Sequence, residues 1–184
     1  MGSEMCIRDS FVAEGQHFTV EEMESKIGVA DKYKRFFRRW LKIFENENFI
    51  KEEQDGFCRT SKSWKVDVAA EWDYLWGVEK QLNYGEGFVR YLEKCSKSLT
   101  QLFRNEIAPL ELLFPHGEMT TAVDTYQKTL SSKILNHMAE CAVLEAYSEK
   151  KGKVFRILEV GAGVGGTSDG IIERLSEQNV EYYY

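Results

Sequence analysis

Apolar residues at helical spacing dominate the first part of the chain. Thr19, followed three residues later by Glu22, predicts a capping box and a short helix that runs to about Lys26. After a glycine break, Asp31 is expected to cap a second and longer helix. The apolar face of that helix is formed by residues that recur every three or four positions: Tyr33, Phe37, Trp40, Leu41 and Phe44.

Two strand-like segments follow this helix. Residues 49–51 and 57–60 are β-prone, and Asp55-Gly56 between them predicts a hairpin turn. The order helix, turn, helix, hairpin is typical of a winged-helix unit, which raises the question of DNA binding. A run of cationic side chains on the second helix is consistent with DNA binding: Lys32, Lys34, Arg35, Arg38, Arg39 and Lys42. The net charge of −6 opposes it, so a solvated or protein-docking face is the favoured interpretation.

Helical spacing continues from residue 63 to about residue 150. Two apolar stripes, expected to be core or subdomain contacts, comprise Trp64, Val68, Trp72, Leu75 and Trp76, and then Phe88, Leu92, Cys95, Leu99 and Leu102. Pro109 and Pro115 bracket a short turn of helix. A further helical stretch is broken near residues 129–132, and Gly152 is placed to end it.

The pattern then changes from helical to α/β. Residues 154–160 form a short apolar run, as in a buried parallel strand, and a glycine-rich turn follows. Residues 168–175 resume helical spacing, and residues 180–184 begin a second strand. This order predicts the first half of a strand–helix–strand crossover, and it places a ligand site at the carboxyl end of the first strand.

The glycine turn has the composition of a cofactor loop. Gly161 and Gly163 permit a tight turn with close approach of a ligand, and Gly165 and Gly166 let the helix begin near the strand. Gly161, Gly163 and Gly166 also satisfy the dinucleotide pattern, so a nicotinamide or flavin site and a loop without a ligand are both alternatives.

The acidic residue before the loop decides between these alternatives. Glu159 stands two positions before the first glycine, where a bound pyrophosphate would meet a negative charge. A carboxylate there suits a ligand with cationic groups, and S-adenosylmethionine (SAM) has an ammonium and a sulfonium. The sequence therefore favours SAM as the cofactor.

At this point the sequence resembles the C-methyltransferase domains of modular polyketide synthases and of their hybrids with peptide synthetases. The most specific part of the resemblance runs from 109–115, through Tyr126 and Asn136, into 156–163. The family loop usually reads Gly-Ala-Gly-Thr-Gly-Gly-Thr, and Val164 replaces the first threonine here. The resemblance implies the following cofactor-binding set: Tyr126, Asn136, Glu159, Gly161, Ala162, Gly163, Gly165, Gly166 and Thr167.

The resemblance also implies a reaction and its partners. The reaction would be methylation of the α-carbon of a β-ketoacyl chain, held as a thioester on the phosphopantetheine arm of an acyl carrier protein, beside other synthase domains. A histidine aided by a carboxylate serves as the base in the family, and both are expected beyond Tyr184. His116 and His137 precede the loop and are interpreted as surface or packing residues. A small-molecule O- or N-methyltransferase and a winged-helix regulator are the alternative functions.

Composition bears on metal sites, disulfides and possible partners. The four cysteines and three histidines are far apart in sequence, which predicts no metal site and no disulfide framework and fits a reducing cytosol. No apolar run approaches the roughly 18 residues of a membrane span, so no membrane partner is expected, and the acidic charge predicts no nucleic-acid partner.

The expected fold is a mainly α N-terminal region followed by the start of an α/β, Rossmann-like methyltransferase domain. Residues 1–10 resemble a non-native or disordered start, 11–62 a winged-helix-like unit, 63–152 a helical lid, and 153–184 an incomplete methyltransferase core. Because such a core lacks partners for its first strand, we expect the isolated chain to bind SAM weakly and to catalyse nothing.

Overall fold

The computed structural model describes residues 14–62, 67–150 and 152–184. The predictions for residues 1–10 and for Trp64 lie outside these ranges. The chain forms two compact units: the first combines Met1–Asp73 with Leu92–Leu112, and the second combines Tyr74–Tyr91 with Leu113–Tyr184. Most residues are helical, and the predicted domain boundaries stay a prediction.

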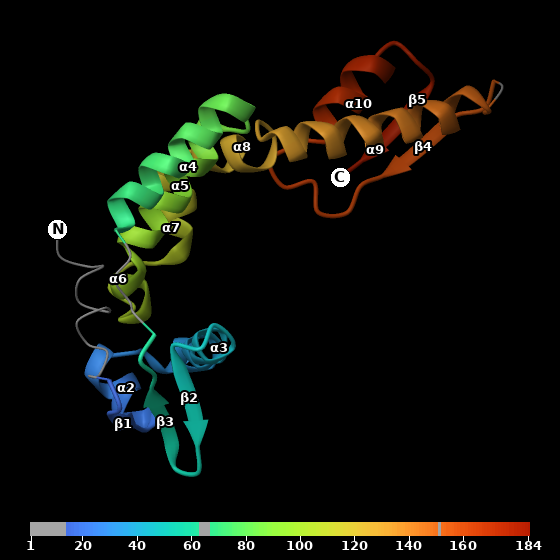
Figure 1. Cartoon of the computed structure of the whole chain (residues 1–184). Coiled ribbons are helices and arrows are strands. Elements are labelled where there is room, and N and C mark those ends of the chain that lie inside the picture. The colour runs from blue at the N-terminus through green and yellow to red at the C-terminus, as the bar shows by residue number, and fades with distance from the viewer. Residues whose placement is uncertain (1–13, 63–66, 151) are drawn as a thin grey trace. The chain divides into compact units, whose positions relative to one another are not determined.

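The first unit contains a small antiparallel sheet and the helices that cover it (Figure 1). The strand order is β1-β3-β2, and its elements are β1 (His17–Phe18), α2 (Val20–Ile27), a 3₁₀ turn (Asp31–Tyr33), α3 (Lys34–Asn46), β2 (Ile50–Glu53) and β3 (Gly56–Arg59). The predicted hairpin is confirmed, with Glu53 opposite Gly56 at its turn. Strand β1, too short for a periodic signal, pairs with β3.

One hydrophobic cluster holds this unit together. Its buried members come from the three strands, from α2, α3 and α6 (Leu99–Phe103), and from the connection after α2: Phe18, Met23, Ile27, Val29, Phe37, Leu41, Ile50, Phe57 and Phe103. The ring of Phe103 lies edge-on to Phe37, with centroids 5.7 Å apart. Phe37 and Leu41 therefore occupy the core, as their spacing predicted.

The two predicted helix starts have different outcomes. The capping box is confirmed, because the Glu22 amide donates to Thr19 Oγ1 at 3.1 Å and Glu22 Oε2 accepts from the Thr19 amide at 2.7 Å. The prediction that Asp31 caps the second helix is wrong. The Asp31 carboxylate lies 2.6 Å from Lys34 Nζ, and the α-helix begins only at Lys34 after a 3₁₀ turn.

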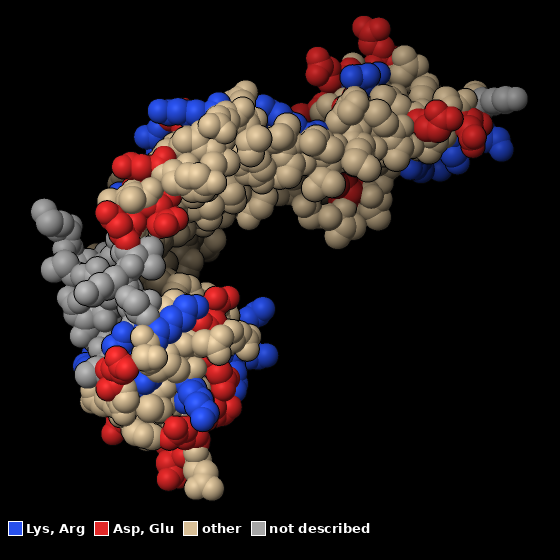
Figure 2. Space-filling model, viewed as in Figure 1, with Lys and Arg blue, Asp and Glu red and all other residues tan. Residues whose placement is uncertain are grey.

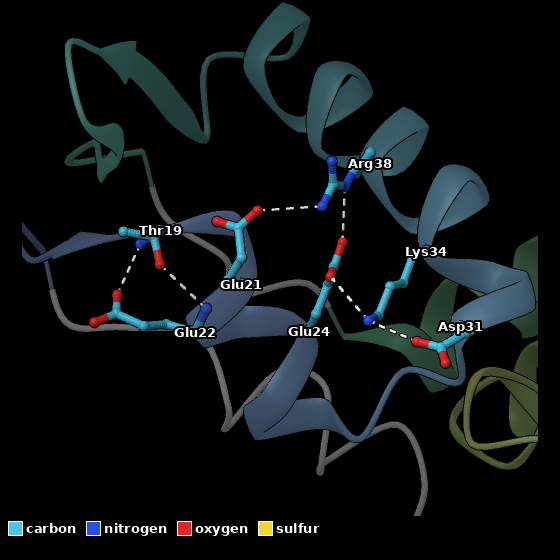
Figure 3. Close-up of polar contacts among 7 residues, drawn as sticks. All are labelled: Thr19, Glu21, Glu22, Glu24, Asp31, Lys34 and Arg38. Atoms are coloured by element: carbon cyan, nitrogen blue, oxygen red, sulfur yellow. Dashed lines mark hydrogen bonds and ion pairs between the residues drawn. The ribbon is translucent and has the colours of Figure 1, made fainter.

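Helices α2 and α3 are also joined by a polar cluster around the buried side chain of Glu24 (Figure 3). The Arg38 Nε atom donates to Glu24 Oε1 at 2.8 Å, and Arg38 also contacts Glu21. Lys34 Nζ lies 4.0 Å from the other oxygen of Glu24. A carboxylate that is 5% exposed is thus compensated by two cations.

The middle of the described chain contains α4, α5, α7 and α8 beside α6, and a 3₁₀ turn at Pro115–Gly117. Helices α4 (Val68–Leu82) and α5 (Glu86–Lys97) each contribute residues to both units. Helix α7 spans Pro109–Leu113, between the two prolines as predicted, and α8 spans Thr120–Tyr126. None of the described helices has the length and hydropathy that a bilayer-spanning segment needs.

The second unit contains the strand–helix–strand element at the end of the chain. Helix α9 (Leu130–Ser148) begins after a break at Thr129, as expected, and lies against α10 (Ser168–Leu175). Strands β4 (Phe155–Leu158) and β5 (Val180–Tyr183) pair in parallel, which confirms the predicted crossover order. The prediction of a buried strand is wrong, because one face of β4 is open: Arg156 is exposed and Leu158 is 76% exposed. Val160, two residues beyond the strand, is 88% exposed.

Candidate cofactor site

The backbone after β4 adopts the conformation that its glycines allow. Gly161, Gly163 and Gly165 have φ angles of 83°, 61° and 79°, in the left-handed region that favours glycine. A Cβ built on Gly161 would meet no atom within 4 Å, so this part of the turn faces open space. The Gly165 amide donates to the carbonyl of Ala162 at 3.0 Å, which closes the turn before α10 begins.

Glu159 lies where the strand gives way to this turn. Its Oε2 atom accepts hydrogen bonds from Ser168 Oγ at 2.5 Å and from the Tyr182 hydroxyl at 2.7 Å. Ile157 is paired with Tyr182 in the parallel register, so Glu159, two residues further on, shares a face with Tyr182. Burial and the hydrogen bond to the Glu159 carboxylate together raise the pKa of Tyr182 to about 12.

Gly166 marks a close approach between the loop and the α8–α9 junction. A Cβ at this position would lie 3.0 Å from Asn136 Nδ2, from Gln127 Cγ and from the carbonyl oxygen of Tyr126. Gly166 was expected to let the helix begin near the strand, which stays a prediction. Its absent side chain also allows close contact with the α8–α9 junction.

Side-chain hydrogen bonds connect the same segments. Thr167 Oγ1 donates to Asn136 Oδ1 at 2.9 Å, and Asn136 Nδ2 donates to the Tyr126 carbonyl at 3.4 Å. Gln127 Nε2 donates to the carbonyl of Val164 at 2.7 Å. The order of the glycine loop therefore depends on residues 126–136 as well as on the strand.

The structure thus brings the predicted site residues together, but Tyr126 takes part through its backbone and not through its side chain. Tyr126 contacts this region through its backbone carbonyl, and its side chain is 55% exposed. Sequence reasoning missed Gln127, Ser168 and Tyr182. The contact of Tyr182 with Glu159 could have been predicted, because Tyr182 lies in the second strand on the side expected for Glu159. No feature of the sequence predicts the contact of Gln127 with the loop.

The two histidines of this unit lie away from the glycine loop contacts. His116 is exposed, with a left-handed φ of 54°. His137 is exposed on α9, where its Nδ1 lies 3.5 Å from Glu140 Oε2 and its Nε2 lies 3.6 Å from Cys141 Sγ. Both positions agree with the interpretation of surface or packing residues.

Glu159 offers a hydrogen-bond acceptor to a ligand at the start of the glycine turn. One oxygen of the Glu159 carboxylate is fixed by two hydroxyl donors, and among the described residues none is hydrogen-bonded to its other oxygen, Oε1. That oxygen belongs to a half-buried carboxylate beside a glycine-rich bend, in which Gly161 and Gly163 carry no side chain. An ammonium group fits such a position, and a pyrophosphate does not.

Three of the six cationic side chains in the basic run at α3 are paired with neighbouring carboxylates, and Figure 2 shows acidic and basic side chains side by side over this unit. Lys34 and Arg38 pair with the carboxylates around Glu24, and Lys42 pairs with Glu45 at 3.0 Å and Glu52 at 2.7 Å. In the described part of the chain, Arg35 and Arg39 have no ion-pair partner and are exposed. The cationic run is therefore much weaker as a nucleic-acid footprint than its sequence indicates.

Comparison with solved structures gives the class of the fold. The structure is similar to the DszA carbon methyltransferase, with a TM-score of 0.84 and 26% identity over 98% of this chain and 48% of that one. It is similar to the CurJ carbon methyltransferase, with a TM-score of 0.82 and 25% identity over 97% of this chain and 48% of that one. The chain thus has the fold of carbon methyltransferase domains, over about half their length.

Curated relatives place the resemblance among polyketide and hybrid synthases. The chain is 27% identical to polyketide synthase PksR of Bacillus subtilis, with 84% of the chain and 6% of that protein covered. It is 24% identical to pyochelin synthetase PchF of Pseudomonas aeruginosa, with 82% of the chain and 8% of that protein covered. No protein-family profile matches. The resemblance to C-methyltransferase domains of polyketide synthases is therefore confirmed.

Proposed function

We propose that this chain belongs to a SAM-dependent C-methyltransferase of a polyketide synthase or hybrid synthase. The single observation that carries the proposal is the Glu159 carboxylate, held by two hydroxyl donors beside a turn with three left-handed glycines. The similarity to carbon methyltransferase structures supports the same class of reaction. The substrate would be a β-ketoacyl thioester on a carrier protein, methylated at its α-carbon.

Glu159 would bind the ammonium of SAM, with Gly161, Ala162 and Gly163 along its amino-acid part. When bound, SAM supplies an electrophilic methyl group on a good leaving group. Ser168 and Tyr182 orient the Glu159 carboxylate before the ligand binds. The entropy cost of ordering this side chain is therefore not subtracted from the binding free energy. No residue of this chain is proposed as the base that removes the α-proton.

Asn136 would act as a positioning residue rather than as a direct ligand. Its amide joins Thr167 at the start of α10 to the Tyr126 carbonyl at the end of α8. In this proposal the helices before β4 belong to a lid subdomain, residues 153–184 begin a Rossmann-like core, and the first unit is winged-helix-like. The boundaries at residues 11–62, 63–152 and 153–184 follow from the same assignment.

The central test measures SAM affinity in the full-length protein by calorimetry. Glu159→Gln keeps the shape of the side chain and removes its charge, so we expect SAM affinity to fall about tenfold or more, which corresponds to about 1.4 kcal/mol. Glu173→Gln, at an exposed position on α10, is the matched control and should bind SAM normally. Equal affinity in both variants, or a preference for NAD or FAD, would contradict the proposal.

A second test concerns the carrier protein. Arg35 and Arg39 lie one helical turn apart on the exposed face of α3, where they can dock an acidic surface. Charge reversal at both positions should slow methylation of a carrier-bound β-ketoacyl thioester and spare a free thioester mimic. Arg38 is left unchanged because it pairs with Glu24. Equal loss with both substrates would exclude docking at this face.

A further inference from the structure

The outer face of the three-stranded sheet collects metal-ligating side chains that are distant in sequence. In the register of β1 and β3, His17 lies directly opposite Cys58. In the register of β2 and β3, Lys51 lies opposite Cys58, and Glu53 lies two residues further along β2. Side chains alternate along a strand, so His17, Cys58 and Glu53 share one face, whereas Phe18, Ile50 and Phe57 point to the core.

These three side chains converge on one point. His17 Nδ1 lies 3.2 Å from Glu53 Oε2, and the ligating atoms of His17, Glu53 and Cys58 all lie within 4.8 Å of one another. Gly56, opposite Glu53, has no side chain to separate Glu53 from β1. A Cβ at Gly56 would also come within 2.4 Å of the Phe18 carbonyl oxygen, so this position requires glycine.

We propose that His17, Glu53 and Cys58 form a binding site for a divalent transition-metal ion, with Zn²⁺ as the favoured ion. Imidazole, carboxylate and thiolate are the three ligand types of protein zinc sites, and three of them leave a fourth tetrahedral position for water. Tetrahedral ligands at zinc bond lengths lie roughly 3.3–3.6 Å apart. His17 Nδ1 and Glu53 Oε2 are already this close, at 3.2 Å, so it is Cys58 Sγ that needs to approach, by up to about 1 Å. Binding converts the Cys58 thiol to a thiolate and releases its proton to solvent.

The surroundings favour a cation and allow it to enter. His17 and Glu53 line an open cleft of about 600 Å³, which Glu22 and Asp55 also line. Figure 2 shows acidic side chains near the tip of the β2–β3 hairpin. Lys51 is the one opposing charge that the register places on this face, and its long exposed side chain can turn its ammonium into water.

The spacing rule that predicted no metal site does not apply to this arrangement. His17 and Cys58 are brought together by strand pairing and not by a short sequence motif. A bound ion would add a link between the two-residue strand β1 and the hairpin, beside their two register pairs and the backbone bonds of Arg59 to Gly15 and Gln16. Zinc binding should therefore raise the Tm of the first unit and slow amide exchange in β1.

Cobalt titration tests the site directly, because Co²⁺ reports its ligands by absorption. The protein should bind one Co²⁺ with a thiolate charge-transfer band and tetrahedral d–d bands, and Zn²⁺ should displace it. Cys58→Ser should abolish the charge-transfer band. A variant with the other three cysteines replaced (Cys6→Ser, Cys95→Ser, Cys141→Ser) should keep it.

Calorimetry with Zn²⁺ tests the other two ligands. His17→Ala and Glu53→Gln should each weaken Zn²⁺ binding about tenfold or more. Glu52→Gln is the matched control, because Glu52 lies on the other face of β2, where it contacts Lys42. Circular dichroism checks that each variant is folded. A cobalt spectrum without the thiolate band, or zinc binding that is indifferent to all three ligands, would overturn the proposal.

Discussion

The hydrophobic cluster of the first unit and the glycine-loop region of the second are stabilised in different ways. The first unit buries large apolar side chains from its helices and its sheet, including Met23, Ile27, Leu41 and Ile50. The second leaves Leu135, Met138, Leu158 and Val160 more than half exposed. Its loop is held mainly by hydrogen bonds, at Glu159, at Asn136 and at Gln127.

This difference shows which interactions determine each region. Apolar burial is additive and tolerant, so the first unit depends on the volume of its core side chains. A hydrogen-bonded loop with few buried neighbours depends on the position of individual atoms, and a change of one atom alters its geometry. Core substitutions should therefore affect stability in the first unit, and single-atom substitutions should affect loop structure in the second.

The largest expected effect comes from deleting a core side chain. Leu41 is 1% exposed on α3, so Leu41→Ala should reduce the free energy of unfolding of the first unit by about 2–5 kcal/mol. Leu135→Ala, on α9, makes the same chemical change at a side chain that is 64% exposed. It should change stability by less than about 0.5 kcal/mol.

Urea unfolding followed by amide exchange in each unit measures both variants. The comparison between the two regions fails if Leu135→Ala costs as much as Leu41→Ala, because the exposed side chain would then have a hidden packing role.

The polar cluster in the first unit gives the next largest effect. Glu24→Ala removes a carboxylate that is 5% exposed and leaves Arg38 and Lys34 without their shared partner, so we expect a loss of about 1–3 kcal/mol. Glu21→Ala is the matched control, because Glu21 contacts the same Arg38 from a position that is 73% exposed. Thermal unfolding should show little change for Glu21→Ala. A similar cost for both would mean that burial of Glu24 adds nothing.

Periodicity predicted those parts of the fold in which one physical effect dominates. The apolar face of α3, the hairpin and the bounds of α10 follow from spacing and turn chemistry. The start of α3 was missed because Asp31 pairs with Lys34 instead of capping the helix. The prediction that β4 is buried was wrong. An apolar run shows that a strand is suited to burial, but among the described strands only β5 pairs with β4.

Only those residues of the candidate site that are close together in the sequence could be predicted from it. Glu159 and the glycines are contiguous, so one pattern reveals them. Ser168 and Tyr182 contact Glu159 only because of helix direction and strand register, and Gln127 contacts Val164 across 37 positions. The same holds for the proposed metal site, because strand pairing brings His17 to Cys58 across 41 positions of the sequence.

A single added methyl group should separate two kinds of glycine in the loop. Gly166→Ala places a Cβ 3.0 Å from Tyr126, Gln127 and Asn136 atoms, so we expect displacement of the loop and a cost of about 1–2 kcal/mol. Gly161→Ala meets no atom within 4 Å and is strained only by its φ of 83°. NMR shifts of residues 126–136 should move for Gly166→Ala and stay unchanged for Gly161→Ala. Movement in both would show that the α8–α9 junction senses any change in the loop.

The smallest effect is confined to high pH and concerns the Tyr182–Glu159 hydrogen bond. Burial first, and then this bond, raise the pKa of Tyr182 to about 12 from its usual value of 10.0. Because the folded-state pKa is raised, the stabilisation from the neutral phenol is complete below pH 10 and is lost as pH rises through about 12. A spectrophotometric titration should show one tyrosine that ionises late, and Tyr182→Phe should remove that step. Glu159→Gln should lower the pKa only partly, since burial remains. A complete return to the usual pKa would mean that the carboxylate, and not burial, dominates the environment of this hydroxyl.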